Sequence, residues 1–214
     1  MGYLCPERTF TMKKILYISL AAFLLPLFSC TRSSTPAPSF DEVVSSRRSI
    51  RAYDPSRSVS KEQIRQIVAC AQEAPSWANV QSTRYYAVTS PENLSALKDL
   101  IGESNKKSAG DAPVLLVSTY VKGQSGFFRA QQTNELGDTW GAYDNGLSSA
   151  FLILKARELG LDTLIMGLRD SDRIRELLGI SNQEEVTSVI ALGYRLSDPA
   201  RPERKPLEDI LKFM

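Results

Sequence analysis

Residues 140–166 read WGAYDNGLSSAFLILKARELGLDTLIM, and this stretch decides the fold class. Apolar side chains at Leu147, Phe151 and Leu154 recur at helical spacing, and Gly160 closes the pattern. The stretch predicts the longest helix of the chain over residues 140–159, buried on nearly all sides. An apolar run over residues 163–166 follows and predicts a strand. A helix that leads at once into a strand indicates a layered α/β fold.

The flanking sequence extends this pattern in both directions. Three more strands are expected, over residues 85–88, 114–120 and 187–194, of which the second is the most apolar and should be central. Ser90-Pro91 opens a helix that Gly102 closes, and another helix is expected around residues 174–178. Together with two N-terminal helices, four strands lie among five helices without a repeat. The expected architecture is an α/β layered sandwich, a mixed central sheet flanked by helices.

Two serines mark the starts of the N-terminal helices. Ser39 with Glu42, and Ser60 with Gln63, have the spacing of capping boxes. Cys70 lies at the edge of the second helix's apolar face, so a buried structural thiol is favoured over a reactive one. That face is made of Ile64, Ile67, Val68 and Ala71.

Composition narrows the possible chemistry. The 214 residues allow one domain with one sizeable core, and outside the first 29 residues 23 basic side chains face 23 acidic ones. No overall positive charge therefore argues for nucleic acid. The chain contains no histidine. The absence of histidine excludes Ser-His-Asp and Cys-His catalysis and argues against a zinc site. A bound cofactor is therefore the simplest explanation for any catalytic activity.

The N-terminus has the pattern of an export signal. The basic residues 13–14 precede an apolar run over residues 15–28 and then Ser29-Cys30. Residues 27–30 are similar to a bacterial lipobox, whose cysteine is lipidated. An uncleaved membrane anchor is the alternative. Residues 1–11 are expected to lie upstream of the true start, because Met12 opens a better signal.

These features predict an exported protein that is lipid-anchored to a bacterial membrane on its periplasmic or surface side. The expected parts are a signal peptide over residues 1–30, a Ser/Pro-rich tether over 31–39 and a folded domain over 40–214. With Cys5 untranslated and Cys30 acylated, Cys70 is the remaining thiol, and no disulfide is expected.

Three polar segments are candidates for a binding site. Arg47-Arg48-Ser49-Ile50-Arg51 could bind a phosphate, although such clusters are often solvated surface. Asn79 and Gln81 follow Pro75-Ser76 on a loop and could read the edge of a flat heterocycle, or simply form a capped turn. Arg204-Lys205 lies in a Pro-stiffened basic tail. Residues 122–131 have weak periodicity and predict a loop or a lid.

In this order and spacing, the three segments resemble the FMN-dependent nitroreductase family. The family pattern has an Arg-x-Ser-x-basic start, a Pro-Ser-x-x-Asn-x-Gln loop, a Met-, Glu- or Pro-Gly pair after the fourth strand and a basic-Pro tail. It is matched over about residues 39–211. Asp144-Asn145-Gly146 also fits. The matching residues are Arg47, Ser49, Arg51, Pro75, Ser76, Asn79, Gln81, Met166, Gly167, Arg204 and Lys205.

The resemblance implies a role for each segment around FMN. Arg47, Ser49, Arg204 and Lys205 would hold the phosphate, with Arg48 beside it. Arg51 and Asn79 would face the pyrimidine side of the flavin near Gln81, and the Met166-Gly167 backbone would approach N5. FMN itself would carry the chemistry, so no side chain is expected to be catalytic. A homodimer is implied, with FMN at its interface and ping-pong transfer from NAD(P)H to a nitroaromatic, a quinone or a similar acceptor.

Three features depart from the family pattern. Ser82-Thr83 stands where Pro-Trp is usual, and Trp77 is large for its loop and could stack on or shield the flavin. Export is the third departure, because nicotinamide donors are not expected outside the cytoplasm. Two alternatives therefore stay open: an exported flavin-binding lipoprotein without turnover, and a flavin-cleaving or dehalogenating relative.

Overall fold

The computed structural model describes residues 37–214, which form one compact unit. The expected signal peptide with Cys30, and residues 31–36 of the expected tether, lie outside the described residues. Within residues 37–214, no helix is both long and apolar enough to cross a membrane. The first helix is α1 (Phe40–Ser46), with Ser39 as its N-cap.

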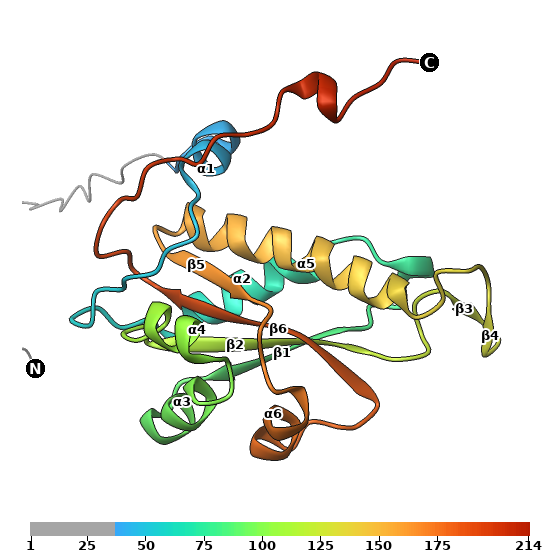
Figure 1. The fold of residues 1–214 in the computed structure, drawn as a ribbon, viewed down its shortest axis with the longest axis horizontal. Coiled ribbons are helices and arrows are strands. Elements are labelled where there is room, and N and C mark those ends of the chain that lie inside the picture. The colour runs from blue at the N-terminus through green and yellow to red at the C-terminus, as the bar shows by residue number, and fades with distance from the viewer. Residues whose placement is uncertain (1–36) are drawn as a thin grey trace, which may run out of the picture. The chain divides into compact units, whose positions relative to one another are not determined.

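A four-stranded sheet forms the centre of the fold (Figure 1). Its order is β1 (Thr83–Val88), β2 (Val114–Val121), β6 (Glu184–Gly193) and β5 (Asp162–Met166), and all neighbouring strands are antiparallel. Ser49 adds a parallel bridge to Thr163 beside β5. The strand expected to be central is confirmed as β2, and the expected strand boundaries hold to within three residues.

Helices cover both faces of the sheet because alternate residues of β2 point to opposite sides. Leu115 and Val117 belong to the core under α3 (Pro91–Lys98) and α6 (Ser171–Leu178). Val114 and Leu116 belong to the core under α2 (Lys61–Gln72) and α5 (Thr139–Glu158). Figure 1 shows α5 on one side of the sheet and α3 and α6 on the other. The α/β sandwich expected from the sequence is confirmed, and the sheet is mixed only through the parallel bridge between Ser49 and Thr163, since its four strands are antiparallel.

The two capping boxes form as expected. The Ser39 N–H donates to Glu42 Oε2 at 2.7 Å, and the Glu42 N–H donates to Ser39 Oγ at 3.3 Å. At the start of α2, the Ser60 N–H donates to Gln63 Oε1 at 3.0 Å, and the Gln63 N–H returns to Ser60 Oγ at 3.1 Å. Each box satisfies two backbone donors that the helix leaves free at its start.

Three local expectations are corrected. The helix α3 ends at Lys98, and Gly102, at φ 76°, precedes a further short helix, α4 (Glu103–Ser108). The segment expected as a loop or lid contains a short hairpin, β3 (Phe127–Phe128) and β4 (Gln131–Gln132), and buries Ser125. Cys70 is half-buried rather than buried, because it lies at the border of the α2–α5 contact.

The long helix α5 is buried on one face only, and the expected apolar stripe is not that face. Leu147 and Leu154 are half-buried, and Phe151 is 37% exposed. The buried face is mostly small and polar: Gly141, Asp144, Asn145, Ser148, Ser149, Leu152 and Ala156. It faces the sheet because its polar groups find partners there, as when Asn145 Nδ2 donates to Ser118 Oγ at 2.9 Å and to Thr119 O at 3.0 Å.

Candidate functional site

The arginine-rich segment runs along the outer edge of β5. Arg47 caps the C-terminus of α1, and its extended backbone turns the chain toward the sheet. The Ile50 N–H then donates to Thr163 O at 3.1 Å, and the Ile50 side chain is buried in the core. Ser49 pairs with Thr163 and is itself exposed, as is Arg51, whose Nη1 donates to Ser49 O at 3.2 Å. The segment is thus fixed to the sheet while its polar side chains stay accessible.

The structure brings the two basic segments together, although they are far apart in sequence. Figure 1 shows the C-terminal tail running past α1. Burial lowers the pKa of Arg47, and the positive charges of Arg204 and Arg48 lower this pKa further. Lys205 is exposed next to Arg204. The positive charges of Arg48 and Arg204 thus both act on Arg47, which favours binding of an anion there.

Arg48 adds unused hydrogen-bonding capacity to this cluster. Its Nη1 donates to Ser45 O at 2.6 Å and to Arg47 O at 2.9 Å. Its Nε is buried, and no atom within residues 37–214 accepts a hydrogen bond from it. Buried donors in proteins are normally paired, so a bound acceptor at this position would complete the arrangement.

The end of β5 offers backbone rather than side chains. The Met166 side chain is buried in the core, and Gly167 is exposed. A Cβ placed on Gly167 would meet no atom within 4 Å, so the backbone is open to close approach. Arg169, which the sequence did not single out, donates from Nη1 to Gly167 O at 2.7 Å and from Nε to Val186 O at 2.9 Å. This side chain fixes the direction of the Gly167 carbonyl.

The loop that carries Asn79 and Gln81 has an unusual backbone. It forms a 3₁₀ turn, Trp77–Asn79, between α2 and β1. Ala78, Asn79 and Gln81 have positive φ angles of 42°, 58° and 51°. Residues other than glycine adopt this conformation at a cost and mostly where the surroundings enforce it, often at functional sites. The two amide side chains of the loop bind each other, since Gln81 Nε2 donates to Asn79 Oδ1 at 3.2 Å.

Asp144 on α5 holds this loop in place. Its Oδ2 accepts the Trp77 N–H at 2.9 Å and the Ser125 hydroxyl at 2.7 Å. Ser125 Oγ lies 2.9 Å from Ser82 Oγ, and all three polar side chains are buried. The carboxylate therefore joins the loop, the segment before the hairpin and α5. The sequence motif contained Asp144, but this role depends on contacts between distant segments and was missed.

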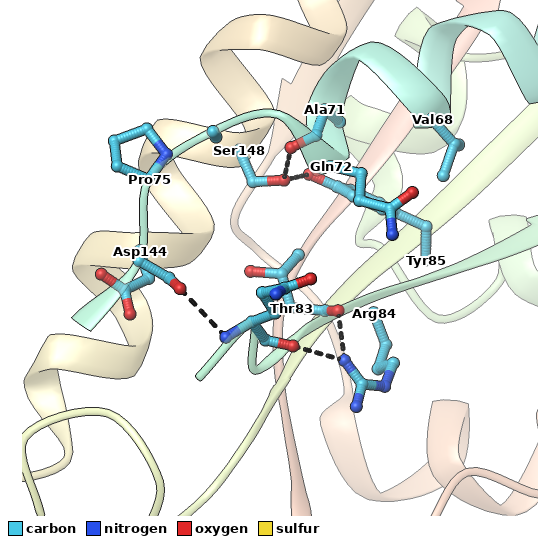
Figure 2. Close-up of a pocket in the computed structure, with 12 residues that line it drawn as sticks. Val68, Ala71, Gln72, Pro75, Thr83, Arg84, Tyr85, Asp144 and Ser148 are labelled. Atoms are coloured by element: carbon cyan, nitrogen blue, oxygen red, sulfur yellow. Dashed lines mark hydrogen bonds between the residues drawn. The ribbon is translucent and has the colours of Figure 1, made fainter. Parts of the chain in front are cut away.

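A cavity of about 320 Å³ opens beside the same loop (Figure 2). It lies between α2, the loop, β1 and α5. In its wall, the Tyr85 hydroxyl donates to Ser148 Oγ at 2.9 Å, and Ser148 Oγ donates to Ala71 O at 2.9 Å. Its lining includes Val68, Gln72, Pro75, Ser76, Gln81 and Arg84. The cavity therefore combines apolar walls with the polar residues of the loop, as small-molecule sites commonly do.

Trp77 is engaged within the chain. Its ring centroid lies 4.8 Å from that of Trp140, and Trp140 meets Tyr143 edge-on at 5.4 Å. Trp77 is half-buried and Tyr143 is 59% exposed. The three rings form an aromatic group next to the Asn79 loop, so shielding of a bound ring by Trp77 stays a prediction.

The expected site residues fall into two groups within one chain. Asn79 and Gln81 precede β1, at one edge of the sheet, whereas Ser49 lies against β5, at the other edge. Three strand spacings separate these edges, or about 14 Å. The β5 edge collects Arg47, Arg48, Ser49, Arg51, Met166, Gly167 and Arg204, with Lys205 following in the tail.

Comparison with known proteins identifies the family. The Nitroreductase family profile matches residues 44–194. YdgI of Bacillus subtilis, a predicted NAD(P)H nitroreductase, is 26% identical over 202 residues, which cover 81% of this chain and 97% of YdgI. The FMN reductase [NAD(P)H] of the same organism is 27% identical over 183 residues, covering 79% and 72% of the two chains.

A solved structure supports the fold. A predicted nitroreductase from Exiguobacterium sibiricum in complex with FMN superposes with a TM-score of 0.73 at 23% identity, over 83% of this chain and 98% of that one. The profile match covers both the arginine-rich segment and the Asn79 loop, and it ends just after β6. The chain therefore belongs to the nitroreductase family.

Proposed function

We propose that two copies of this chain bind FMN between them and pass electrons from a small-molecule donor to an acceptor such as a nitroaromatic or a quinone. Family membership makes the chain an FMN-dependent oxidoreductase. The single observation that carries the more detailed proposal is that the positive charges of Arg48 and Arg204 both act on Arg47, because an anion bound among them explains this arrangement.

The residues present fit FMN. The crowded guanidiniums and the unpaired Nε of Arg48 suit a phosphate, which accepts several charge-assisted hydrogen bonds. Arg47, Ser49, Arg204 and Lys205 would hold it, with Arg48 beside it. The open backbone at Gly167 suits a flat ring that must approach closely.

FMN, when bound, supplies reversible acceptance and release of electrons, and the chain supplies binding and electrostatics. Arg51 and Asn79 would bind the pyrimidine side of the ring, near Gln81. The Arg51 guanidinium is exposed and would place positive charge where the reduced ring becomes negative. The Gly167 backbone, fixed by Arg169, would approach the N5 side. No side chain of the protein needs to transfer a proton for this assignment.

A homodimer accounts for the separation of the two groups of residues. One copy would supply the β5 edge and the other the Asn79 loop, so a complete site requires both. Apolar side chains that are exposed in the single chain support this arrangement, since large exposed apolar patches mark interfaces. They include Phe151 on α5 and, in the tail, Leu207, Ile210 and Phe213.

The proposed reaction is ping-pong, with NADH or NADPH as the donor in vitro. The replacement of the usual Pro-Trp by Ser82-Thr83 does not remove the loop's support, because Ser82 contacts Ser125 in the network around Asp144. Purified protein should be yellow, should bleach on addition of NADH, and should be reoxidised by a nitroarene or quinone. Bleaching by dithionite alone would favour the flavin-binding lipoprotein without turnover.

Substitution tests the phosphate site directly. Arg47→Ala and Lys205→Ala should each weaken FMN binding by about 1.5–3 kcal/mol, or roughly ten- to a hundredfold, because each removes a charge-assisted contact. Arg173→Ala, an exposed arginine on α6, is the matched control. FMN occupancy after dialysis measures the effect. Unchanged occupancy in both variants would refute the site.

We also propose that the protein is exported and lipid-anchored through Cys30. The support is the sequence around residues 12–30, with a charged start, an apolar run and a lipobox-like end. Labelling with a clickable fatty acid should mark the wild type and not Cys30→Ala. Equal labelling of the two proteins, or of neither, would contradict the assignment.

A further inference from the structure

A buried carboxylate between two guanidiniums stands behind the arginine-rich segment. Asp162, the first residue of β5, is 2% exposed. Arg195 binds it with two hydrogen bonds, from Nε to Oδ2 at 2.7 Å and from Nη2 to Oδ1 at 2.6 Å. Arg157, on α5, donates from Nη1 to Oδ2 at 3.1 Å. Paired, hydrogen-bonded guanidiniums are what allow a carboxylate to be buried.

Both guanidiniums also bind Ser46, the last residue of α1. Arg195 Nη2 donates to Ser46 O at 3.1 Å, and Arg157 Nε donates to Ser46 Oγ at 3.1 Å. Ser46 directly precedes Arg47. The next residue of β5, Thr163, accepts the Ile50 N–H and pairs with Ser49. Consecutive residues of β5 therefore hold the phosphate-binding segment at both of its ends.

Some arginines of this region are paired with a carboxylate, and others are not. The carboxylate of Asp162 neutralises part of the charge of Arg157 and Arg195 and orients both. Within residues 37–214, Arg47 and Arg48 form no ion pair with a carboxylate, so both remain available to an anion. The negative charge of Asp162 acts on Arg47 from a distance and partly opposes the lowering of its pKa.

We propose that Asp162 is a positioning residue for the phosphate end of the flavin. Through Arg157 and Arg195 it fixes the end of α1, and with it the directions in which Arg47, Arg48 and Ser49 leave the backbone. It does not touch the ligand. The proposal rests on the proposed function, because it assumes that this segment binds the FMN phosphate.

Riboflavin, which lacks only the phosphate of FMN, provides the test. Dissociation constants of both flavins are measured for the flavin-free full chain by quenching of flavin fluorescence. Asp162→Asn keeps the size of the side chain and removes its charge. FMN binding should weaken about tenfold or more, as expected when an oriented charge-assisted contact is lost. Riboflavin binding should change less than about twofold, because riboflavin lacks the phosphate that Arg47, Arg48 and Ser49 would bind.

Two further variants keep the test decisive. Ser46→Ala removes a hydroxyl that accepts from Arg157 Nε and donates weakly to Val43 O at 3.4 Å. The variant should fold normally and lower the preference for FMN over riboflavin by roughly two- to threefold. If loss of the buried charge prevents Asp162→Asn from folding, Ser46→Ala still tests the positioning role. Asp172→Asn, an exposed acid paired with Arg175 on α6, should leave the preference unchanged.

The possible outcomes distinguish the positioning role of Asp162 from the phosphate site itself. Equal weakening of both flavins in Asp162→Asn and Ser46→Ala would show a purely structural role and overturn the proposal. Wild-type protein that binds FMN no better than riboflavin would instead refute the phosphate site itself, and the proposal with it.

Discussion

Two glycines of α5 should respond oppositely to the same substitution. A Cβ on Gly141 would lie 2.3 Å and 2.5 Å from Cδ2 and Cε2 of the Tyr120 ring, and 2.9 Å from its Cγ. Tyr120 is 7% exposed and belongs to the central strand β2, so the ring has little room to withdraw. A Cβ on Gly146 would meet no atom within 4 Å.

The magnitudes follow from two opposing effects. Replacing glycine by alanine inside a helix stabilises it by about 0.8–1 kcal/mol. Overpacking a core costs about 1–3 kcal/mol, and the short contacts with Tyr120 place Gly141→Ala at the upper end. Gly141→Ala should therefore lower the free energy of unfolding by about 2 kcal/mol, whereas Gly146→Ala should raise it by nearly 1 kcal/mol. In a domain of this size, each kcal/mol shifts Tm by about 2–4 °C.

Thermal unfolding of both variants and the wild type measures the difference. FMN and protein concentrations are held equal, because ligand binding and association change the apparent stability. Gly146→Ala is the matched control, since it has the same chemistry in the same helix. Wild-type stability of Gly141→Ala would show that α5 does not lie directly on Tyr120. A similar loss in both variants would show that the outer face of α5 is packed as tightly as the inner one.

Other substitutions probe the Asn79 loop and the core. Asp144→Ala should weaken FMN binding by about 1.5–3 kcal/mol and speed amide hydrogen exchange at residues 76–81, because the loop loses the charged acceptor of the Trp77 N–H. Unchanged exchange would count against this role of Asp144. Trp77→Ala should raise the rate at which NADH bleaches the flavin in anaerobic stopped-flow measurements, with little change in FMN affinity. A rate no faster than that of the wild type would mean that Trp77 has a structural role, consistent with its contact with the Trp140 ring. Burial raises the pKa of Tyr53, and that of Tyr120 to about 12, so the folded chain keeps protons that the unfolded chain loses near pH 10. The free energy of unfolding, measured with urea, should therefore fall as the pH rises above about 10, and it should fall less steeply in Tyr53→Phe. An equally steep fall in this variant would mean that Tyr53 does not contribute to the pH dependence.

The sequence predicted features that depend on near neighbours along the chain. The capping boxes at Ser39 and Ser60 formed because their partners lie three residues away. The central strand was recognised because β2 is buried on both faces and opens with four consecutive apolar residues, Val114 to Val117. The ordered motifs also indicated the family, because each motif is a short segment that can be recognised without knowing what packs around it.

Long-range packing decided what those patterns could not. The inner face of α5 is small and polar, so the apolar periodicity of the helix indicated the wrong side. Gly141 faces the sheet because the Tyr120 ring leaves no space for a side chain there, and Asn145 faces it because Ser118 offers a hydrogen-bond partner. The sequence did not single out Asp162, which directly precedes the strand expected over residues 163–166. Its burial between two guanidiniums depends on residues that meet only when β5, α5 and the end of α1 are assembled. The separation of the site residues onto two edges of the sheet likewise follows from strand order, which pairs β5 with β6 and leaves β1 at the opposite edge. Local spacing determines which elements form, but only the assembled fold determines which side chains are buried, paired and left free to bind.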